Sequence, residues 1–218
     1  MPARPFQAIT GVAAPLMRDH IDTDVIIPSR EITSPSRVGY GPKLFAPWRY
    51  LEPGGPENPD FILNRPPWRE ARILLAGRNF GCGSSREMAV WALAQFGIGC
   101  VIAPSFGAIF RHNGIRNGLL PVVLPHATVA EIAYEAEQAA QAMVLHVDLL
   151  SSSIRVQTTH NGTLVERTLS FEFDPDEREM LLTGRDAIDR AWDHRLAIET
   201  FEQRDRIERP WAWTHRAS

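Results

Sequence analysis

The chain has 218 residues, of which 44% are hydrophobic and 22% charged, so it has the composition of a globular protein and room for one sizeable core. Its formal net charge of −3 argues against nucleic acid or an anionic membrane surface as a partner. No apolar run reaches the length of a membrane span, and the first residues lack the apolar core of a signal peptide, so we expect a cytoplasmic protein.

The first distinctive segment, residues 34–67, is dense in proline, glycine and aromatic residues. Proline excludes a long helix here, because it lacks an amide donor and clashes with the preceding turn. The aromatic content is too high for a disordered linker. We therefore predict a long ordered loop of the kind that belongs to a binding site or an interface.

The segment that follows alternates between strand and helix patterns. Short apolar runs predict buried strands, and residues with helical apolar spacing predict the helices between them. The predicted elements are a strand at 71–77, a helix at 85–96 that Gly97 ends, a strand at 99–105, a short helix or broken turn at 106–118, a strand at 119–125 and a helix at 127–144. Next, Asn161-Gly162 predicts a hairpin turn between strands, and residues 186–208 carry a helical apolar stripe. This order indicates one α/β domain with a mixed sheet over residues 1–218.

The two cysteines, Cys82 and Cys100, are too few for a zinc ion or an iron–sulfur cluster, which usually take four ligands, so we expect no metal site in this chain. Cys100 is expected to fill core space in a strand. Cys82 lies between two glycines, and the sequence leaves open whether it is a small filler or a functional thiol.

A glycine-rich loop separates the first predicted strand from the helix in "NFGCGSSREMAV", residues 79–90. The first amides of a helix have no partner inside the helix and attract anions. Gly81 and Gly83 are able to adopt positive φ, so that a ligand approaches the backbone of Gly81, Cys82 and Gly83 closely. This arrangement predicts an anion-binding loop.

Side chains around the helix start support this interpretation. Ser84 and Glu87 have the spacing of a capping box, which leaves Ser85 to face a ligand, although the two serines could exchange roles. Arg86 offers a planar fork for a carboxylate or phosphate. A capped helix without function is the plain alternative. The loop lacks the lysine of a P-loop and the third glycine of the dinucleotide fingerprint, so a small carboxylate is the favoured ligand.

Several motifs in order carry a resemblance to a known family. "HIDTDVIIPSR", "GYGPKLFAPWRYL", "NFGCGSSRE", "VIAPSFGAIFRHNGIRNGLLPV" and "FEFDPDEREMLLTGRDAID" together resemble the small subunits of 3-isopropylmalate dehydratase, in the aconitase superfamily. The resemblance implies a compact swivelling β/β/α domain like the C-terminal domain of aconitase. It also implies a hydro-lyase, active only with a large subunit that carries a 4Fe-4S cluster. That heteromeric enzyme would isomerise 2-isopropylmalate to 3-isopropylmalate by dehydration and rehydration, in leucine biosynthesis.

The resemblance also implies roles for individual residues. Ser84 matches the base that removes a proton next to a carboxylate, and Asp24 matches an acidic residue that orients hydrogen bonds in the site. Ser85 and Arg86 match substrate-binding positions, and Arg37 is a further candidate for a carboxylate contact. From the residues alone, Asp24 could equally cap a turn, and Arg37 could be a solvated arginine.

Two positions depart from the family pattern. Glu31 and Ile32 stand where the family has an aromatic-leucine pair that contacts the substrate's side chain, so we expect both to be substrate-binding positions. A carboxylate facing an isopropyl group is costly to desolvate, so either Glu31 points to water or the substrate is more polar or smaller. Met88 replaces the usual histidine. The alternatives are therefore the same chemistry on a citramalate- or dimethylmaleate-type acid, and a carboxylate-binding module without catalysis.

Overall fold

The computed structural model describes residues 5–32, 36–139, 142–160, 163–185 and 187–213. The chain divides into two compact units, residues 1–184 and 185–218. The first unit contains the whole sheet, and the second consists of helices. The expectation of one domain over residues 1–218 stays a prediction.

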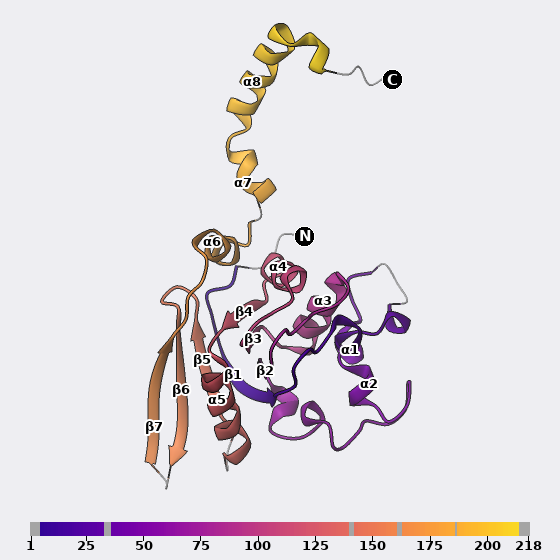
Figure 1. The fold of residues 1–218 in the computed structure, drawn as a ribbon, viewed down its shortest axis with the longest axis vertical. Coiled ribbons are helices and arrows are strands. Elements are labelled where there is room, and N and C mark those ends of the chain that lie inside the picture. The colour runs from indigo at the N-terminus through magenta and orange to yellow at the C-terminus, as the bar shows by residue number, and fades with distance from the viewer. Residues whose placement is uncertain (1–4, 33–35, 140–141, 161–162, 186, 214–218) are drawn as a thin grey trace. The chain divides into compact units, whose positions relative to one another are not determined.

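The first unit is built on a mixed sheet of seven strands in the order β4-β3-β2-β1-β5-β6-β7 (Figure 1). The strands are β1 (Ala8–Leu16), β2 (Ile73–Ala76), β3 (Cys100–Ala103), β4 (Leu120–Val123), β5 (Val144–Asp148), β6 (Ser153–His160) and β7 (Thr163–Ser170). Neighbouring strands from β1 to β4 pair in parallel, whereas β5, β6 and β7 add to the other side of β1 as antiparallel strands. The predicted α/β class with a mixed sheet is confirmed.

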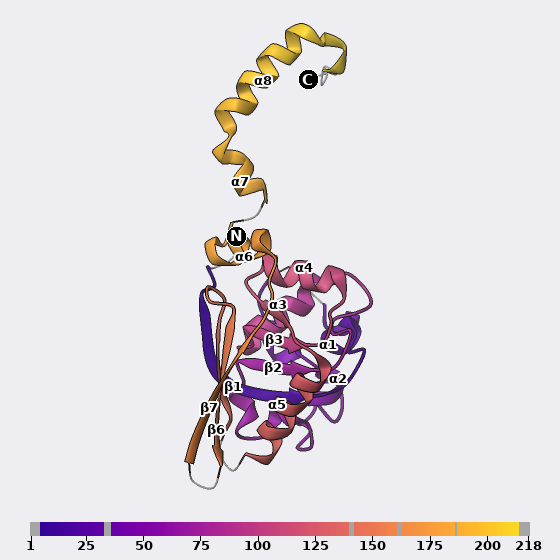
Figure 2. The same cartoon turned by 60° about the vertical axis from the view of Figure 1, so that its left-hand side comes forward.

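Helices cover both faces of this sheet. They are α1 (Thr23–Ile26), α2 (Ala46–Arg49), α3 (Glu87–Phe96), α4 (Ala108–Arg116), α5 (His126–Gln138) and α6 (Pro175–Thr183). Figures 1 and 2 both show α5 alongside β1 and β2, which it contacts. Alternate side chains of β2 point to opposite faces: Ile73 and Leu75 join the core under α5, and Leu74 and Ala76 join the core under α1 and α3.

Most predicted elements of the first unit are present. The strands predicted at 71–77, 99–105 and 119–125 are β2, β3 and β4, and the helix predicted at 85–96 is α3. The helix predicted at 127–144 ends earlier, at Gln138, and β5 begins where it was expected to end. The hairpin is β6 and β7, and its predicted turn at Asn161-Gly162 lies outside the described residues.

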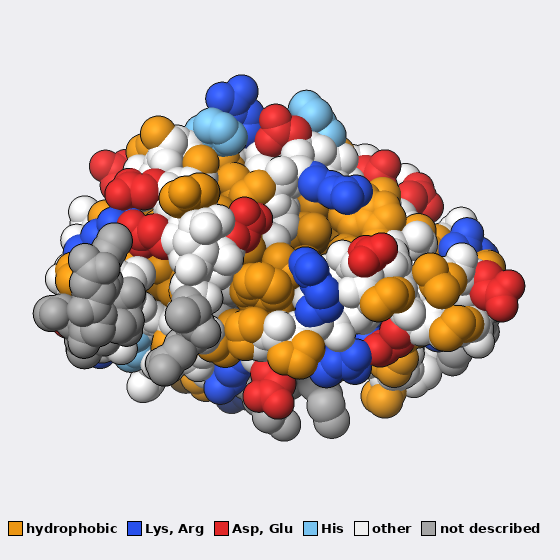
Figure 3. Space-filling model, turned by 90° about the horizontal axis from the view of Figure 1, so that it is seen from below, with side chains coloured by type: hydrophobic (Ala, Val, Ile, Leu, Met, Phe, Trp, Pro, Cys, Tyr) orange, Lys and Arg blue, Asp and Glu red, His pale blue; other side chains and the backbone are white. Residues whose placement is uncertain are grey.

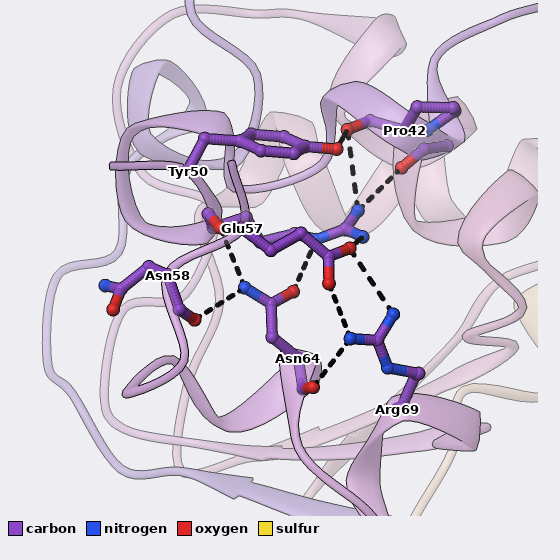
Figure 4. A network of polar contacts seen from close by, with 8 residues as sticks. Pro42, Tyr50, Glu57, Asn58, Asn64 and Arg69 are labelled. Carbon is purple, nitrogen blue, oxygen red and sulfur yellow. Dashed lines mark hydrogen bonds and ion pairs between the residues drawn. The ribbon is translucent and has the colours of Figure 1, made fainter. Parts of the chain in front are cut away.

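The proline-rich excursion is ordered over its described residues 36–67, as predicted. Its short turns meet at Arg49, whose side chain is buried. Figure 4 shows polar residues of this network, among them Glu57, Asn64 and Arg69. The Arg49 guanidinium donates to Asn64 Oδ1 (3.2 Å), to the Gly41 carbonyl (3.3 Å) and to Glu57 Oε1 (3.4 Å). Arg69 donates to the other Glu57 oxygen at 2.5 Å. One buried cation therefore holds several turns of a segment that has no long helix or strand.

The second unit contains α7 (Ala187–Asp193) and α8 (Arg195–Glu208), so the predicted C-terminal helix is divided at His194. None of the helices in the described part of the chain is long and apolar enough to cross a membrane. Figure 3 views the underside of Figure 1, and acidic and basic side chains are interspersed there among hydrophobic ones. This mixture differs from the basic stripe that nucleic-acid-binding faces usually carry.

Candidate functional site

The glycine loop and a second loop leave the sheet side by side. The N-terminal loop (residues 17–24) follows β1, and the glycine loop (residues 77–86) follows β2, which is the parallel neighbour of β1. The Gly81 amide donates to the Ile21 carbonyl at 2.7 Å, and the Thr23 amide donates to the Cys82 carbonyl at 2.9 Å. Both loops thus extend from the carboxyl ends of parallel strands, which is where open α/β sheets bind ligands.

Both glycines in the loop have backbone conformations that favour glycine, as predicted. Gly81 has φ +73° and Gly83 has φ +89°. At Gly81 space is also restricted, because a Cβ atom there would lie 2.2 Å from Cγ of the Phe110 ring. At Gly83 the nearest atom would be Asp22 Cβ, at an ordinary 3.4 Å. Gly81 is therefore required by conformation and by packing, and Gly83 by conformation alone.

The predicted capping box is wrong. Helix α3 begins at Glu87 with Arg86 as its N-cap residue, and no side chain caps it. The Glu87 carboxylate instead accepts a hydrogen bond from Asn117 Nδ2 at 2.9 Å. The Ser84 hydroxyl has no partner among the described residues, so it is not used for helix capping.

The start of α3 is open to solvent. Gly83, Ser84 and Ser85 are exposed, and Cys82 and Arg86 are half-buried. Within the described part of the chain, the amides of Ser84 and Ser85 have no acceptor. Amide donors, two hydroxyls and a guanidinium therefore stand together at a surface that an anion is able to reach.

Asp24 and Arg86 form an ion pair between the two loops. Arg86 Nη1 donates to Asp24 Oδ1 and, at 3.3 Å, to the Ile27 carbonyl. The hydrogen bond from Arg86 holds the pKa of Asp24 below its ordinary value, although the Asp24 side chain is 55% exposed. Arg86 Nε and Nη2 have no partner among the described residues, so part of the fork remains available. Asp22, not Asp24, caps α1, by accepting from the Val25 amide at 2.8 Å.

Thr23 is a site residue that the sequence analysis missed. Its side chain is 1% exposed, and its hydroxyl donates to the Ser84 carbonyl at 2.8 Å. The sequence pattern assigned a role to Asp24 only, and the neighbouring Thr23 gave no signal of its own. Only the pairing of the two loops places it beside Ser84.

The other predicted substrate-binding residues contact different parts of the structure. The Arg37 guanidinium lies 5.1 Å from the centre of the Trp91 ring. Glu31 Oε1 lies 3.7 Å from Arg30 Nε, so its carboxylate has a cationic neighbour, and Ile32 packs against the core under α3. In the described residues, neither Arg37 nor Glu31 contacts the Asp24–Arg86 pair.

The cysteines do not form a ligand set. Cys100 is fully buried in β3, where desolvation raises the pKa of its thiol. Cys82 lies in the glycine loop, and burial, followed by the nearby Asp22 carboxylate, raises the pKa of its thiol. Within the described ranges, no three His, Cys, Asp or Glu side chains stand together as metal ligands. The donors among the described residues therefore do not fit an iron–sulfur cluster.

Known proteins resemble this chain over nearly its whole length. The model of the aconitase C-terminal domain matches residues 3–127. A 3-isopropylmalate dehydratase small subunit from Cupriavidus necator is 49% identical over 209 residues, covering 95% of this chain and 97% of the relative. One from Afipia carboxidovorans is 45% identical over 206 residues, covering 94% and 98%. A solved 3-isopropylmalate dehydratase from Methanocaldococcus jannaschii is 26% identical with a TM-score of 0.58, covering 88% of this chain and 98% of the other. The chain therefore belongs to the aconitase C-terminal domain family, and within it to the small subunits of 3-isopropylmalate dehydratase.

Proposed function

We propose that this chain is the substrate-recognition half of a two-subunit hydro-lyase that converts 2-isopropylmalate to 3-isopropylmalate in leucine biosynthesis. The observation that carries the proposal is the exposed start of α3, where the open amides of Ser84 and Ser85 lie beside a partly available Arg86. A dicarboxylic acid supplies the anionic groups that such a surface binds.

In this proposal Arg86 binds a substrate carboxylate through Nε and Nη2. Asp24 holds the opposite side of the guanidinium and so fixes the plane of the fork. A fixed fork loses less conformational entropy on binding than a freely rotating one. The nearby Ser84 hydroxyl has no partner among the described residues and is available to the same substrate.

Ser84 acts as the base in this mechanism. As an alkoxide it takes the proton from the carbon next to a carboxylate, while the hydroxyl group leaves the neighbouring carbon and an unsaturated diacid forms. In the return step Ser84 gives that proton to the carbon that lost the hydroxyl group, while hydroxide adds to the carbon that lost the proton, so that Ser84 is an alkoxide again. A hydroxyl is a weak base at neutral pH, so the amides and the guanidinium must stabilise its oxyanion.

A 4Fe-4S cluster would supply a Lewis acid for the departing hydroxyl group, and we assign it to the large subunit. The reason lies in this chain's own donors: one thiol is sealed in β3 and the other lies alone in the glycine loop. The large subunit is thus the expected partner. The cytoplasmic location expected from the sequence stays a prediction that cell fractionation would test.

The direct test is reconstitution with a large subunit under anaerobic conditions. The ultraviolet absorbance of the unsaturated intermediate would be followed with 2-isopropylmalate as substrate. Turnover that requires both subunits supports the proposal. Binding of the diacid without turnover in any reconstituted pair would instead favour a carboxylate-binding module and would refute the enzymatic role.

The Glu31 and Ile32 positions favour a second test, of substrate choice. Because Glu31 has Arg30 as a neighbour, its carboxylate need not face an isopropyl group. The reconstituted pair should therefore prefer 2-isopropylmalate to citramalate- or dimethylmaleate-type acids. A Glu31→Leu variant should keep that order of relative rates. A preference for a smaller or more polar acid, lost in this variant, would assign Glu31 to the substrate pocket.

A further inference from the structure

Thr23, the first residue of α1, makes hydrogen bonds through its amide, its carbonyl and its hydroxyl. Its amide donates to the Cys82 carbonyl at 2.9 Å, and its own carbonyl accepts from the Ile27 amide at 2.9 Å. Its hydroxyl reaches the Ser84 carbonyl at 2.8 Å, and the residue is 1% exposed. Thr23 is therefore fixed by its backbone on both sides, and its hydroxyl is aimed across the two loops at the backbone of the proposed base.

The Ser84 carbonyl is consequently constrained from two directions. It accepts from the buried Thr23 hydroxyl and, at 2.8 Å, from the Arg86 amide. The Arg86 amide is thereby used inside the loop and is not available to a ligand. The Ser85 amide, in contrast, belongs to the same peptide group as this carbonyl and has no acceptor among the described residues.

Peptide geometry links these two facts. The Ser84–Ser85 peptide is trans, so its C=O and N–H point in opposite directions. Because the carbonyl points inward to a buried hydroxyl, the Ser85 N–H must point away from the interior, on the side where Ser84 and Ser85 are exposed. The direction of one buried hydrogen bond therefore sets the direction of one exposed donor.

We propose that Thr23 is a positioning residue, which holds the Ser84–Ser85 peptide so that the Ser85 amide stabilises negative charge at the catalytic centre. This inference rests on the proposed function. Thr23 does not touch the substrate. Its hydroxyl acts through the orientation of a donor that matters most when charge develops on the Ser84 oxygen, because preorganised donors stabilise such charge without reorganising.

The role requires a hydroxyl, and the methyl group is secondary. Thr23→Val keeps the shape of the side chain and removes the donor, whereas Thr23→Ser keeps the donor and removes a buried methyl. Serine is therefore expected to lower the melting midpoint at least as much as valine. If kcat falls only when the hydroxyl is lost, and the melting midpoint falls when the methyl group is lost, the two variants distinguish a positioning role of Thr23 from a packing role.

The experiment measures kcat, KM and the melting midpoint of the reconstituted two-subunit enzyme with 2-isopropylmalate. Thr23→Val is expected to lower kcat about ten- to a hundredfold, somewhat less than complete loss of one oxyanion donor, with KM changed less than about threefold. Thr23→Ser is expected to keep kcat near that of the wild type. Thr183→Val is the control for loss of a threonine hydroxyl elsewhere in the chain, since it removes an exposed hydroxyl that donates to the Glu179 carbonyl at 2.7 Å on α6, outside the two loops.

The possible outcomes distinguish failure of this inference from failure of the proposed function. Wild-type kcat in Thr23→Val, or equal loss of kcat in the valine and serine variants, would overturn the inference while leaving the proposed function intact. A wild-type pair that shows no turnover would overturn the proposed function and this inference with it. If Thr23→Val does not fold, Thr23→Ala also lacks the hydroxyl and is compared with Thr23→Ser in the same way.

Discussion

Replacing Gly81 by alanine tests whether the shape of the loop depends on this glycine. Two effects are expected to lower the free energy of unfolding of this variant. A non-glycine residue at φ +73° costs about 1–2 kcal/mol. The new Cβ would lie 2.2 Å from Cγ of the Phe110 ring, and Phe110 is 2% exposed, so the ring must move within a packed core. Such overpacking costs about 1–3 kcal/mol, which gives a total of about 2–5 kcal/mol.

Gly83→Ala is the matched control. It has the same requirement for positive φ, at +89°, but its Cβ would have ordinary van der Waals contacts. We therefore expect it to lower the free energy of unfolding by about 1–2 kcal/mol only. Urea unfolding of the purified chain, followed by circular dichroism, would measure both variants.

Substitution of Phe110 tests whether the steric clash between the new Cβ and the Phe110 ring destabilises Gly81→Ala. The Phe110 ring stacks with Phe106 and meets Phe80 edge to face, at centroid distances of 6.4 and 5.3 Å, so it has little room to retreat. In a Phe110→Leu background, Gly81→Ala should cost less than in the wild type, with a coupling of about 0.5–3 kcal/mol. Equal losses for Gly81→Ala and Gly83→Ala, or strict additivity with Phe110→Leu, would refute the reasoning.

Three further predictions concern charge and thiol chemistry. Asp24→Asn should destabilise the chain at neutral pH, and the difference from wild type should vanish on acidification. The Arg86 hydrogen bond lowers the folded-state pKa of Asp24. The contribution of Asp24 to the free energy of unfolding is therefore present above the unfolded-state pKa and is lost as the pH falls through the folded-state pKa. Urea unfolding of both proteins at a series of acidic pH values would show this, and a difference that grows with acidity would contradict it. Arg86→Lys should lower kcat/KM about ten- to a hundredfold in the reconstituted enzyme, since lysine lacks the fork; steady-state rates equal to wild type would exclude the carboxylate contact. A thiol reagent followed by mass spectrometry should label Cys82 and not Cys100 in the folded chain, because Cys100 is fully buried, and comparable labelling of both would contradict the placement of β3.

The sequence predicts those elements whose apolar pattern agrees with their final burial. β2 reads as a continuous apolar run and is buried on both faces, and α3 ends at Gly97, which adopts φ +117°. β1 was missed because Gly11 and Pro15 weaken the strand pattern. β5 was not predicted, although its burial alternates residue by residue, as expected for a strand; the predicted helix overlaps it only at Val144.

The sequence indicated which residue types form the candidate site, but it did not indicate most of the contacts between them. Ser84 and Glu87 have the spacing of a capping box, but no such box forms. Glu87 instead accepts a hydrogen bond from Asn117, a residue distant in the sequence. Similarly, spacing gives no indication that Asp24 pairs with Arg86, or that Thr23 supports Ser84. These contacts depend on β1 and β2 being parallel neighbours, so that their following loops run together, and this tertiary pairing is not encoded in any short motif.

Replacing the Ser84 hydroxyl tests the central claim most directly. Because that hydroxyl does not cap α3 and has no partner in the described residues, Ser84→Ala should leave the melting midpoint within about 2 °C of the wild type. In the reconstituted enzyme, the same variant should lower kcat with 2-isopropylmalate more than about a thousandfold, because the base is removed. Wild-type turnover by a folded Ser84→Ala enzyme would contradict the account.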